Sequence, residues 1–417
     1  MSSTSLPWPR LVGLVAFALA LGIVSNTLEP ALLGHKALEL VPENKNTALG
    51  LTTFGGLLVA LLWQPIVGGW SDRLSSRWGR RIPFFLVGTV IAGVSLVAIA
   101  GAPVFGLVVV GVLFTQLGTN TIQGPWQALI PDGVPLLQRG RAAGYKALLE
   151  ILGFIVGRWA SGRLVGQGQP LAAVGVAIAG LLAALALSLA VLERRPARPD
   201  AAGPASSAPA RPGIAALFRG TFQVDWKANP GFGWWMLNRF LFWGGFIALN
   251  TFLLFYLIDA QGMAEPDAQR FAGDVATVLG AAILVVTFPA GWVSDRIGRR
   301  AMVSGTGILA AAGTGLLITA RGAPAVVAAG AVLGLGVGAF LSADWALLTD
   351  IVPRASAARY LGIANVAAAG GSAMARLLGG VLIDPLAKLG GHPLAGYGAV
   401  FGAAMIGFLV AAWAILR

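Results

Sequence analysis

The chain alternates between long apolar stretches and short polar segments. Each apolar stretch holds enough residues for a membrane-spanning α-helix, which needs roughly 20. The twelve stretches lie at 11–33, 47–70, 82–101, 103–130, 142–166, 171–192, 233–258, 268–293, 301–320, 323–350, 356–381 and 395–416. This pattern predicts an all-α membrane protein with twelve transmembrane helices. It does not fit a β-barrel, whose strands show alternating polarity over roughly ten residues.

The composition agrees with this prediction and excludes several classes of protein. Of the 417 residues, 57% are hydrophobic and only 11% are charged, against roughly 25% charged in soluble domains. Because the chain has no cysteine, disulfides and thiolate metal sites are excluded. The sequence contains no zinc-protease motif, phosphate-binding loop or catalytic triad pattern, so we expect no enzyme, no metal and no cofactor. His35 and His392 fall in predicted outer loops, where we expect them to be solvated.

The net charge of +12 is explained by where the basic residues fall. If both termini are cytoplasmic, 19 of the 29 Lys and Arg residues lie in inner loops, six lie outside and four lie within the stretches. This split fixes the orientation by the positive-inside rule. We therefore expect a multi-pass protein of the cell (inner) membrane with cytoplasmic termini. We expect a monomer in the lipid bilayer, without a nucleic-acid partner.

Residues 193–230 differ from the rest of the chain. This segment is rich in Arg, Pro, Ala and Ser and is too polar to span a membrane. Such a composition is typical of a flexible linker. The predicted organisation is an N-terminal six-helix bundle at 1–192, a cytoplasmic linker at 193–230 and a C-terminal six-helix bundle at 231–417.

The two halves of the chain repeat each other. The segment Gly68–Arg73 matches Gly291–Arg296 at an offset of 223 residues, and each copy is followed by Gly-Arg-Arg. At an offset of 218, Asp132, Val134, Pro135, Arg141, Gly144 and Arg158 match Asp350, Val352, Pro353, Arg359, Gly362 and Arg376. Parallel repeats of six helices characterise one architecture of secondary transporter.

The repeated loop carries a resemblance to a known family. Its second copy reads G-x-x-S-D-R-x-G-R-R from Gly291 and resembles the signature loop of the major facilitator superfamily. Residues 64–84 and 120–132 resemble the sucrose/proton symporter branch, which is related to the glycoside–cation symporters. The resemblance implies two pseudo-symmetric bundles that transport a sugar or glycoside by alternating access, with proton symport as the coupling.

The resemblance also implies a role for the charged residues of the two loops. Asp72 and Asp295 would brace neighbouring helices by meeting helix N-termini and arginines when the inner gate is shut. Arg141 and Arg359 are their candidate partners. The predicted gating set is Asp72, Arg73, Arg80, Arg141, Asp295, Arg296, Arg299 and Arg359. The alternative is that the arginines only anchor the topology.

The fourth stretch carries a stripe of neutral amides. Gln116, Asn120, Gln123 and Gln127 fall within an arc of roughly 60° on a helix. Asn120 and Gln123 lie roughly 14–18 Å from the cytoplasmic end, near mid-membrane. Amides donate and accept hydrogen bonds, which suits hydroxyl-rich ligands. We expect Asn120, Gln123 and Gln127 to bind substrate; interhelical hydrogen bonding is the alternative.

The seventh stretch offers a second candidate surface for substrate. Arg239, Trp243, Phe246 and Asn250 recur at helical spacing. An intramembrane charge is a functional-site hypothesis by default, and an indole beside it could stack on a sugar ring. We expect Arg239, Trp243 and Asn250 to contact substrate. The alternative is that the aromatic residues pack against helices or lipid.

Three carboxyl groups are candidates for proton coupling. Glu150 lies roughly 14 Å deep in the fifth stretch, where Lys146 precedes it by one turn. It is the first candidate, with a structural ion pair to Lys146 as the alternative. Asp344 and Glu29 are the other two. We expect Arg158, in the same stretch as Glu150, to extend its guanidinium to the outer surface.

The sequence departs from the resembled branch at two places. The acid and the arginine that plant sucrose transporters carry in the fourth span are Gln116 and Gln127 here. Residues 47–70 also lack the acids that sodium-coupled relatives use in the second span. We therefore expect coupling to protons at another carboxyl. Two alternatives remain: an exporter of amphiphilic small molecules, and a transport-inactive membrane receptor or assembly factor.

Overall fold

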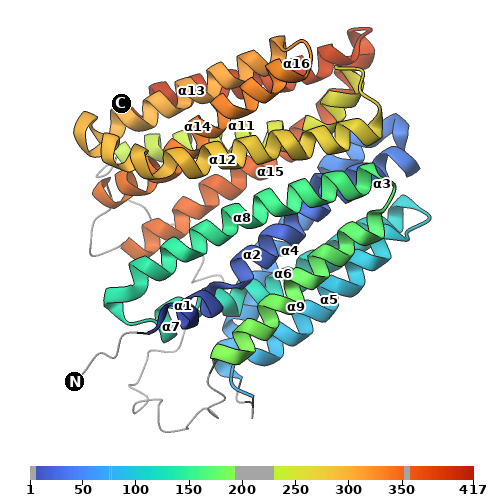
Figure 1. Ribbon diagram of the computed structural model, residues 1–417. Coiled ribbons are helices and arrows are strands. Elements are labelled where there is room, and N and C mark those ends of the chain that lie inside the picture. Colours follow the sequence, from blue (N-terminus) through green and yellow to red (C-terminus); the bar gives the residue numbers. More distant parts are fainter. Residues whose placement is uncertain (1–5, 75, 77, 193–229, 352–356) are drawn as a thin grey trace. The chain divides into compact units, whose positions relative to one another are not determined.

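The computed structural model describes residues 6–74, 76, 78–192, 230–351 and 357–417, and within them all regular secondary structure is helical (Figure 1). Side chains are described in these ranges except at residues 230, 349 and 357–362. The predicted linker lies outside the described residues apart from its last position. Helices satisfy their backbone polar groups internally, which is what a chain without access to water requires.

The first half of the chain forms six long helical segments. The first of them is interrupted, with a π-helical turn η1 at its centre. In order the elements are α1 (Trp8–Val15), α2 (Phe17–Asn26), η1 (Thr27–Leu32), α3 (Leu33–Leu40), the short η2 (Pro42–Asn44), α4 (Lys45–Arg73), α5 (Ile82–Ala100), α6 (Phe105–Gln127), the short α7 (Leu129–Gly133) and η3 (Leu136–Gln138), α8 (Arg139–Gly166) and α9 (Pro170–Val191).

The second half forms six further long helices within the described residues. They are α11 (Pro230–Asp259), α12 (Glu265–Ile297), α13 (Arg299–Thr319), α14 (Ala323–Ile351), α15 (Ala357–Leu389) and α16 (Pro393–Ala414). Each of the twelve predicted stretches thus corresponds to one long helical segment. Proline at the first or second helical position begins α5, α9 and α16, where its missing N–H leaves no hydrogen bond unmade.

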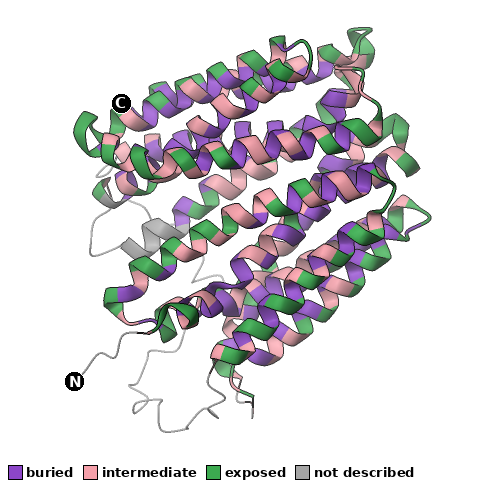
Figure 2. Ribbon diagram, in the orientation of Figure 1, coloured by how far each residue is buried: buried purple, intermediate pink, exposed green. Residues whose placement is uncertain are grey.

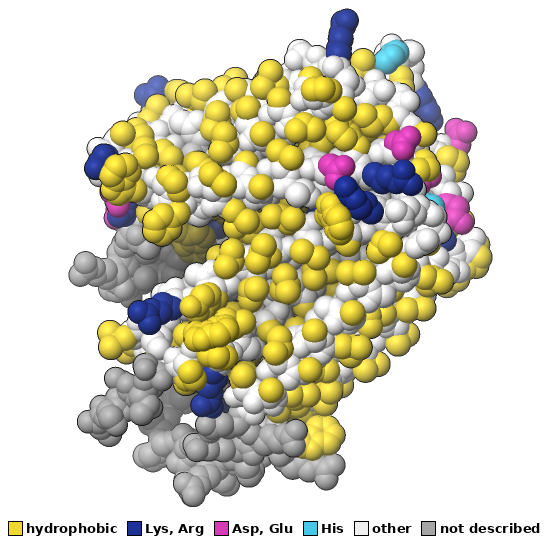
Figure 3. Space-filling view, in the orientation of Figure 1, with side chains coloured by type: hydrophobic (Ala, Val, Ile, Leu, Met, Phe, Trp, Pro, Cys, Tyr) yellow, Lys and Arg dark blue, Asp and Glu magenta, His cyan; other side chains and the backbone are white. Residues whose placement is uncertain are grey.

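Eleven of the helical segments in the described residues are long and apolar enough to cross a membrane. The remaining long helix is α8, which is interrupted by charged residues along its 28-residue length. Large apolar side chains face outward from the long helices, among them Leu62, Val94 and Phe288. Figure 2 shows exposed residues along the helices, and Figure 3 shows hydrophobic side chains spread over the visible face, as expected for surfaces in contact with lipid.

The chain divides into two compact units. Unit 1 comprises Met1–Ala202 and Gly262–Thr277, and unit 2 comprises Gly203–Gln261 and Val278–Arg417. The first part of α12 therefore packs within unit 1, and the rest of that helix belongs to unit 2. The duplication seen in the sequence is visible in the internal packing of each unit.

One close helix crossing recurs at equivalent positions in both units. A Cβ atom on Gly118 of α6 would lie 2.6 Å from the Ala92 nitrogen and 2.9 Å from the Gly88 carbonyl oxygen of α5. A Cβ atom on Gly336 of α14 would lie 3.0 Å from the Ala310 nitrogen and 3.2 Å from the Thr306 carbonyl oxygen of α13. All three residues of one contact differ from those of the other by 218. Glycine at these positions lets two backbones touch.

The signature loops also share a backbone requirement. Gly79 has a φ of 91° and Gly298 a φ of 93°, a conformation that other residues rarely adopt. Gly298 immediately precedes α13, and Gly79 lies three residues before α5. The repeated Gly-Arg-Arg is therefore a turn whose basic residues directly precede α5 in the first half and begin α13 in the second.

We expect Gly118→Val to destabilise the protein by about 1–3 kcal/mol, because the new side chain must push two backbones apart. Gly336→Val should cost less, since its nearest contact is 3.0 Å rather than 2.6 Å. Thermal unfolding of the purified protein in detergent measures both. The control is Gly175→Val on α9, an exposed site with no atom within 4 Å of the added Cβ. Equal melting temperatures for all three variants would contradict the prediction.

Candidate functional site

Unit 1 contains a pocket with a mixed polar and apolar wall. Four residues of α6 form its polar side, and α2 and η1 form the other. The lining residues are Leu21, Val24, Ser25, Leu28, Thr115, Gln116, Thr119 and Gln123. All eight side chains are uncharged, and five of them carry hydroxyl or amide groups. Such a wall suits a neutral ligand that combines hydroxyl groups with apolar faces.

Hydrogen bonds along α6 fix the polar wall. The Thr115 hydroxyl donates to the Gly111 carbonyl at 2.9 Å, and the Thr119 hydroxyl donates to the Thr115 carbonyl at 2.9 Å. Each hydroxyl oxygen keeps lone pairs that accept from a ligand. The Asn120 amide donates to the Gln116 carbonyl at 2.8 Å and to its side-chain oxygen at 3.3 Å. Asn120 therefore positions Gln116.

The predicted amide stripe is divided by the structure. Gln123 lines the pocket. Asn120 is buried behind it, with 4% of its surface exposed. Gln127 lies one turn further on and is exposed, where its side chain accepts a hydrogen bond from Gln64 at 3.0 Å. The pocket thus takes two amides of the stripe, Gln116 and Gln123, together with Thr115 and Thr119 on the same helix face. Asn120 and Gln127 do not line it.

Sequence reasoning missed three hydroxyl residues of this pocket, namely Ser25, Thr115 and Thr119. Serine and threonine in membrane helices commonly bond to the preceding turn, so their presence alone carries little signal. The signal available was their position beside the amides. Thr119 shares a face with Gln116 and Gln123 at spacings of three and four residues.

Unit 2 brings two of the predicted residues together. Arg239 of α11 and Asp344 of α14 form a buried ion pair, with 6% and 1% of their side chains exposed. The guanidinium lies 5.2 Å from the Trp235 ring and 5.1 Å from the Trp345 ring. An aromatic enclosure strengthens electrostatic attraction by excluding water. The two residues were predicted for different roles, and the structure makes them partners.

The other predicted contacts on α11 are less enclosed. Trp243 is half-buried, and its ring lies 6.0 Å from Phe246 in an edge-to-face arrangement. Asn250 is also half-buried, two turns further along the helix. The Trp243 indole nitrogen is buried without a hydrogen-bond partner among the described residues. A ligand that accepted a hydrogen bond there would satisfy it.

The remaining candidate carboxyls lie in unit 1. Glu150 is partly exposed and pairs with Lys146 at 2.7 Å, one turn earlier on α8. Glu29 interacts electrostatically with Arg158. Arg158 itself is buried, with 3% of its surface exposed. The expectation that its guanidinium reaches the outer surface is therefore wrong, because the side chain is buried in the helix packing.

The first signature loop is organised around a buried arginine that the sequence analysis did not select. Arg81 forms ion pairs with Asp132 and, at 3.6 Å, with Asp72. It also donates to the Pro125 carbonyl, in the last turn of α6, at 2.6 Å. Arg80 is a more distant partner of Asp132 at 3.8 Å. Cations suit a helix C-terminus, where backbone carbonyls are unsatisfied.

The second loop repeats this arrangement with a shift of one residue. Arg299 pairs with Asp350 at 2.5 Å and with Asp295 at 3.9 Å. It donates to the Ala346 carbonyl at 2.7 Å. In sequence Arg299 matches Arg80, but in contacts it matches Arg81. Arg81 lies directly before the first residue of α5, whereas Arg299 is the first residue of α13.

The other residues of the predicted gating set are peripheral to these contacts. Arg73, Arg141 and Arg296 are exposed, and the Arg296 guanidinium lies 3.5 Å from the centre of the Trp292 ring. Arg359 lies outside the residues whose side chains are described. Their part in gating stays a prediction.

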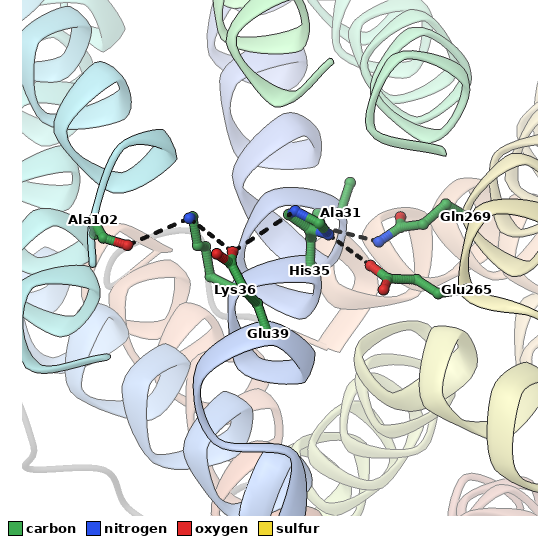
Figure 4. Close-up of polar contacts among 7 residues, drawn as sticks. All are labelled: Ala31, His35, Lys36, Glu39, Ala102, Glu265 and Gln269. Carbon is green, nitrogen blue, oxygen red and sulfur yellow. Dashed lines mark hydrogen bonds and ion pairs between the residues drawn. The ribbon is translucent and has the colours of Figure 1, made fainter. Parts of the chain in front are cut away.

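A second polar cluster in unit 1 joins α3 to the first turns of α12 (Figure 4). The His35 ring lies 2.6 Å from a Glu265 oxygen and 3.9 Å from Glu39. Lys36 pairs with Glu39 at 2.8 Å and donates to the Ala102 carbonyl at 3.3 Å. The expectation that His35 is solvated is wrong, because α3 continues as a helix and turns the ring toward Glu265.

The first turns of α12 also pack closely on α8. Arg163 pairs with Asp274 at 2.7 Å, and Arg270 donates to the Gly166 carbonyl at 3.2 Å. A Cβ atom on Gly273 would lie 2.8 Å from the Arg158 carbonyl, so this contact is backbone to backbone. We call the His35–Glu265 and Arg163–Asp274 pairs together the α12 clasp.

Within the described residues, no group of three or more His, Asp and Glu side chains is arranged to hold a metal ion.

Comparisons with known proteins agree with this architecture. The family model described as MFS/sugar transport protein matches residues 41–412. The chain is 31% identical over 134 residues to sucrose transport protein SUC3 of Arabidopsis thaliana, covering 26% of this chain and 22% of that protein. It is 31% identical over 118 residues to proton-associated sugar transporter A of Homo sapiens, covering 25% of this chain and 16% of that protein. The chain thus spans less than a quarter of each relative's length.

A solved structure shares the fold over almost the whole chain. The crystal structure of a D-xylose-proton symporter superposes with a TM-score of 0.77 at 16% sequence identity, covering 98% of this chain and 97% of that one. At this identity the likeness shows the fold alone. It confirms the predicted class, an all-α multi-pass membrane protein with the helices of two six-helix halves.

The α12 clasp generates a prediction about local opening. Arg163→Gln removes a partly exposed ion pair, and Glu265→Gln removes the carboxylate that the His35 ring contacts; each contact is worth about 0.2–1 kcal/mol. We expect each variant to raise by up to about fivefold the rate at which a maleimide labels a cysteine at Ala268, which is fully buried in α12. Because the chain has no native cysteine, Ala268→Cys is a specific reporter. Glu43→Gln, an exposed carboxyl of η2, is the control and should leave the labelling rate unchanged. A labelling rate that neither clasp variant changes would contradict the prediction.

Proposed function

The chain belongs to the MFS/sugar transport protein family, and we propose that it is a secondary active transporter that carries a sugar or glycoside together with a proton. It works by alternating access between its two six-helix halves. Binding of substrate and proton on one side of the membrane is followed by release on the other.

The observation that carries this proposal is the pocket of unit 1. Its amide and hydroxyl side chains lie opposite the apolar side chains of Leu21, Val24 and Leu28. A sugar presents hydroxyl groups at its edge and C–H groups on its faces, so the two walls complement it. The pocket has no charged lining residue, which favours a neutral substrate over an organic ion.

Similarity to transport proteins supports the same reading. The relatives are a sucrose transport protein and a proton-associated sugar transporter. In this proposal Gln123 contacts substrate directly, with Asn120 holding Gln116 in place. Gln127 is a further amide toward the end of α6, and Arg239, Trp243 and Asn250 are the candidate contacts of unit 2.

The proposal includes the expected setting of the protein. It is a monomer in the cell (inner) membrane with both termini cytoplasmic, it catalyses no chemical reaction, and it has no nucleic-acid partner. The paired arginine clusters around Arg81 and Arg299 brace the ends of the helices that must move as rigid bodies during transport.

The proposal is tested with protein reconstituted into liposomes. We expect radiolabelled sucrose, maltose or D-xylose to accumulate when an inward proton gradient is imposed, and the accumulation to disappear when a protonophore collapses that gradient. Binding of none of these sugars in a thermal-shift screen, together with no gradient-driven uptake, would contradict the proposal. Efflux of amphiphilic dyes instead would favour the exporter.

Gln123→Ala tests the pocket itself. Loss of one neutral hydrogen bond costs about 0.5–1.5 kcal/mol, so we expect the KM for the accumulated sugar to rise about two- to tenfold. The matched control is Gln167→Ala, which removes an exposed amide at the end of α8 and should leave KM unchanged. Identical KM values for Gln123→Ala and the wild type would place the substrate elsewhere.

A further inference from the structure

The ion pair between Arg239 and Asp344 is exceptional within unit 2. It joins α11 to α14, and both side chains are almost completely removed from solvent. The neighbouring turn is apolar, with Phe242 stacked on Phe340 at 3.7 Å between ring centres. Burying two charges in such surroundings usually costs more than their attraction returns, so the pair is poorly explained as a device for stability.

The hydrogen bonding of the pair is incomplete. One Asp344 oxygen binds Arg239, but the other, Oδ1, is buried without a hydrogen-bond partner among the described residues. The Arg239 Nε is likewise buried without a hydrogen-bond partner among the described residues. A fully stabilised buried pair would satisfy these atoms. Oδ1 is therefore an enclosed acceptor that no described protein group satisfies.

The charged groups around Asp344 come from few elements. From α11 the group that faces it is Arg239. From α13 the nearby cation is Arg299, which is committed to Asp350 and to the Ala346 carbonyl. On α14 itself the next acid is Asp350, six residues away. Arg239 is thus the counter-ion that contacts Asp344 in the described residues.

Unit 1 provides an internal comparison, because the same helix packing exists there with aromatic residues at the two equivalent positions. Gly22 of α2 meets Gly153 of α8, just as Gly244 of α11 meets Gly371 of α15. Gly22 and Gly244 are 222 residues apart in the sequence. At this offset Arg239 of α11 corresponds to Phe17 of α2. At the α6–α14 offset of 218, Asp344 aligns with Trp126.

Phe17 and Trp126 are both buried, and the Trp126 indole donates to the Leu14 carbonyl at 3.0 Å. At these positions unit 1 has aromatic side chains and a neutral hydrogen bond, and the nearby Lys146, 5.6 Å from the centre of the Trp126 ring, pairs with Glu150 on its own helix. The packing does not require an ion pair at this place.

We propose that Asp344 is the carboxyl that binds the transported proton, and that proton binding releases Arg239 to donate hydrogen bonds to the substrate. This inference rests on the proposed function and names its coupling site. The proton adds to Oδ1 of the Asp344 carboxylate and gives a neutral acid. Arginine stays protonated throughout, so its guanidinium then needs other acceptors. The hydroxyl oxygens of a sugar supply them, and the Trp235 and Trp345 rings stabilise the remaining charge.

The exchange of partners couples the two ligands. A buried carboxyl group is stable either as a carboxylate beside its counter-ion or as the neutral acid. A buried carboxylate without a counter-ion is costly. Arg239 therefore leaves Asp344 only when a proton takes its place. Substrate that binds to the released Arg239 in turn stabilises the protonated acid, as thermodynamic reciprocity requires.

Glu150 lacks the burial and the counter-ion from another helix that Asp344 has. It is 47% exposed, and its partner Lys146 lies on the same helix, one turn away. Because both side chains remain accessible to solvent, neither needs the other to offset the cost of burying a charge. Replacing Glu150 is therefore the natural comparison for replacing Asp344.

Infrared difference spectroscopy tests the proton site without a known substrate. We expect the purified wild type to gain the carbonyl band of a protonated carboxyl group when the pH is lowered. Asp344→Asn should lose this component, whereas Glu150→Gln should keep it. The double variant Asp344→Asn/Arg239→Gln removes both charges and serves if the single variant does not fold. Asp267→Asn, an exposed acid near the start of α12, controls for surface carboxyls. Retention of the full wild-type signal in both Asp344 variants overturns the inference.

Arg239→Gln provides a second, opposite readout. Without its counter-ion Asp344 should stay neutral, so the carboxylic acid band should be present already at pH 7. Absence of that band from Arg239→Gln at pH 7 would also overturn the inference.

Transport assays separate this inference from the proposed function. With the sugar that the wild type accumulates, we expect Asp344→Asn to equilibrate and exchange that sugar without concentrating it against a gradient. Full proton-driven accumulation by Asp344→Asn overturns the inference and leaves the proposed function intact. Absence of uptake in the wild type contradicts the proposed function, and the infrared signal of Asp344 then still decides the proton site.

Discussion

Helices in a bilayer gain little by hiding apolar side chains from lipid, so their association depends on how closely their backbones approach. In this protein that constraint is met by Gly118 on α6 and Gly336 on α14, whose missing side chains let one helix rest on the backbone of its neighbour. The contact occurs at the same place in both halves. It fixes the α5–α6 and α13–α14 pairs, and the positions of all functional side chains on α6 and α14 follow from it.

The same medium decides where charge is placed. The arginine clusters around Arg81 and Arg299 lie at helix ends, where each guanidinium satisfies a backbone carbonyl as well as two acids. Charge within the spans is more costly, and three of the basic residues there have an acidic partner: Glu29 near Arg158, Glu150 beside Lys146, and Asp344 on Arg239. Among these the Arg239–Asp344 pair has no exposed side, which is why its titration would have the largest consequences.

The sequence predicted the fold well because membrane helices are specified by continuous apolar length and the halves are marked by a repeated loop. It predicted individual contacts less well. Arg158 was expected at the surface, yet it is buried in the helix packing, where Glu29 of another helical segment interacts with it electrostatically. Arg80 was predicted for the gating set, but Arg81 makes the close contacts. The motif does not reveal that α5 begins one residue later, relative to the Gly-Arg-Arg segment, than would place Arg80 at these contacts. The amides of α6 were found, but Thr115, Thr119 and Ser25 gave no signal until the neighbouring helix was in place.

Duplication explains how one scaffold holds two different sites. The polar wall residues Thr115, Gln116, Thr119 and Gln123 correspond, at an offset of 218, to Leu333, Gly334, Val337 and Leu341. Unit 2 therefore has no equivalent of the polar wall, and Gly334 is instead pressed against the backbone of α12. Conversely, unit 1 has Phe17 and Trp126 where unit 2 has its ion pair. In the symport that we propose, the uncharged wall of unit 1 contacts the sugar and Asp344 of unit 2 binds the proton. Two copies of one helix packing thus let the two units carry different side chains at equivalent positions.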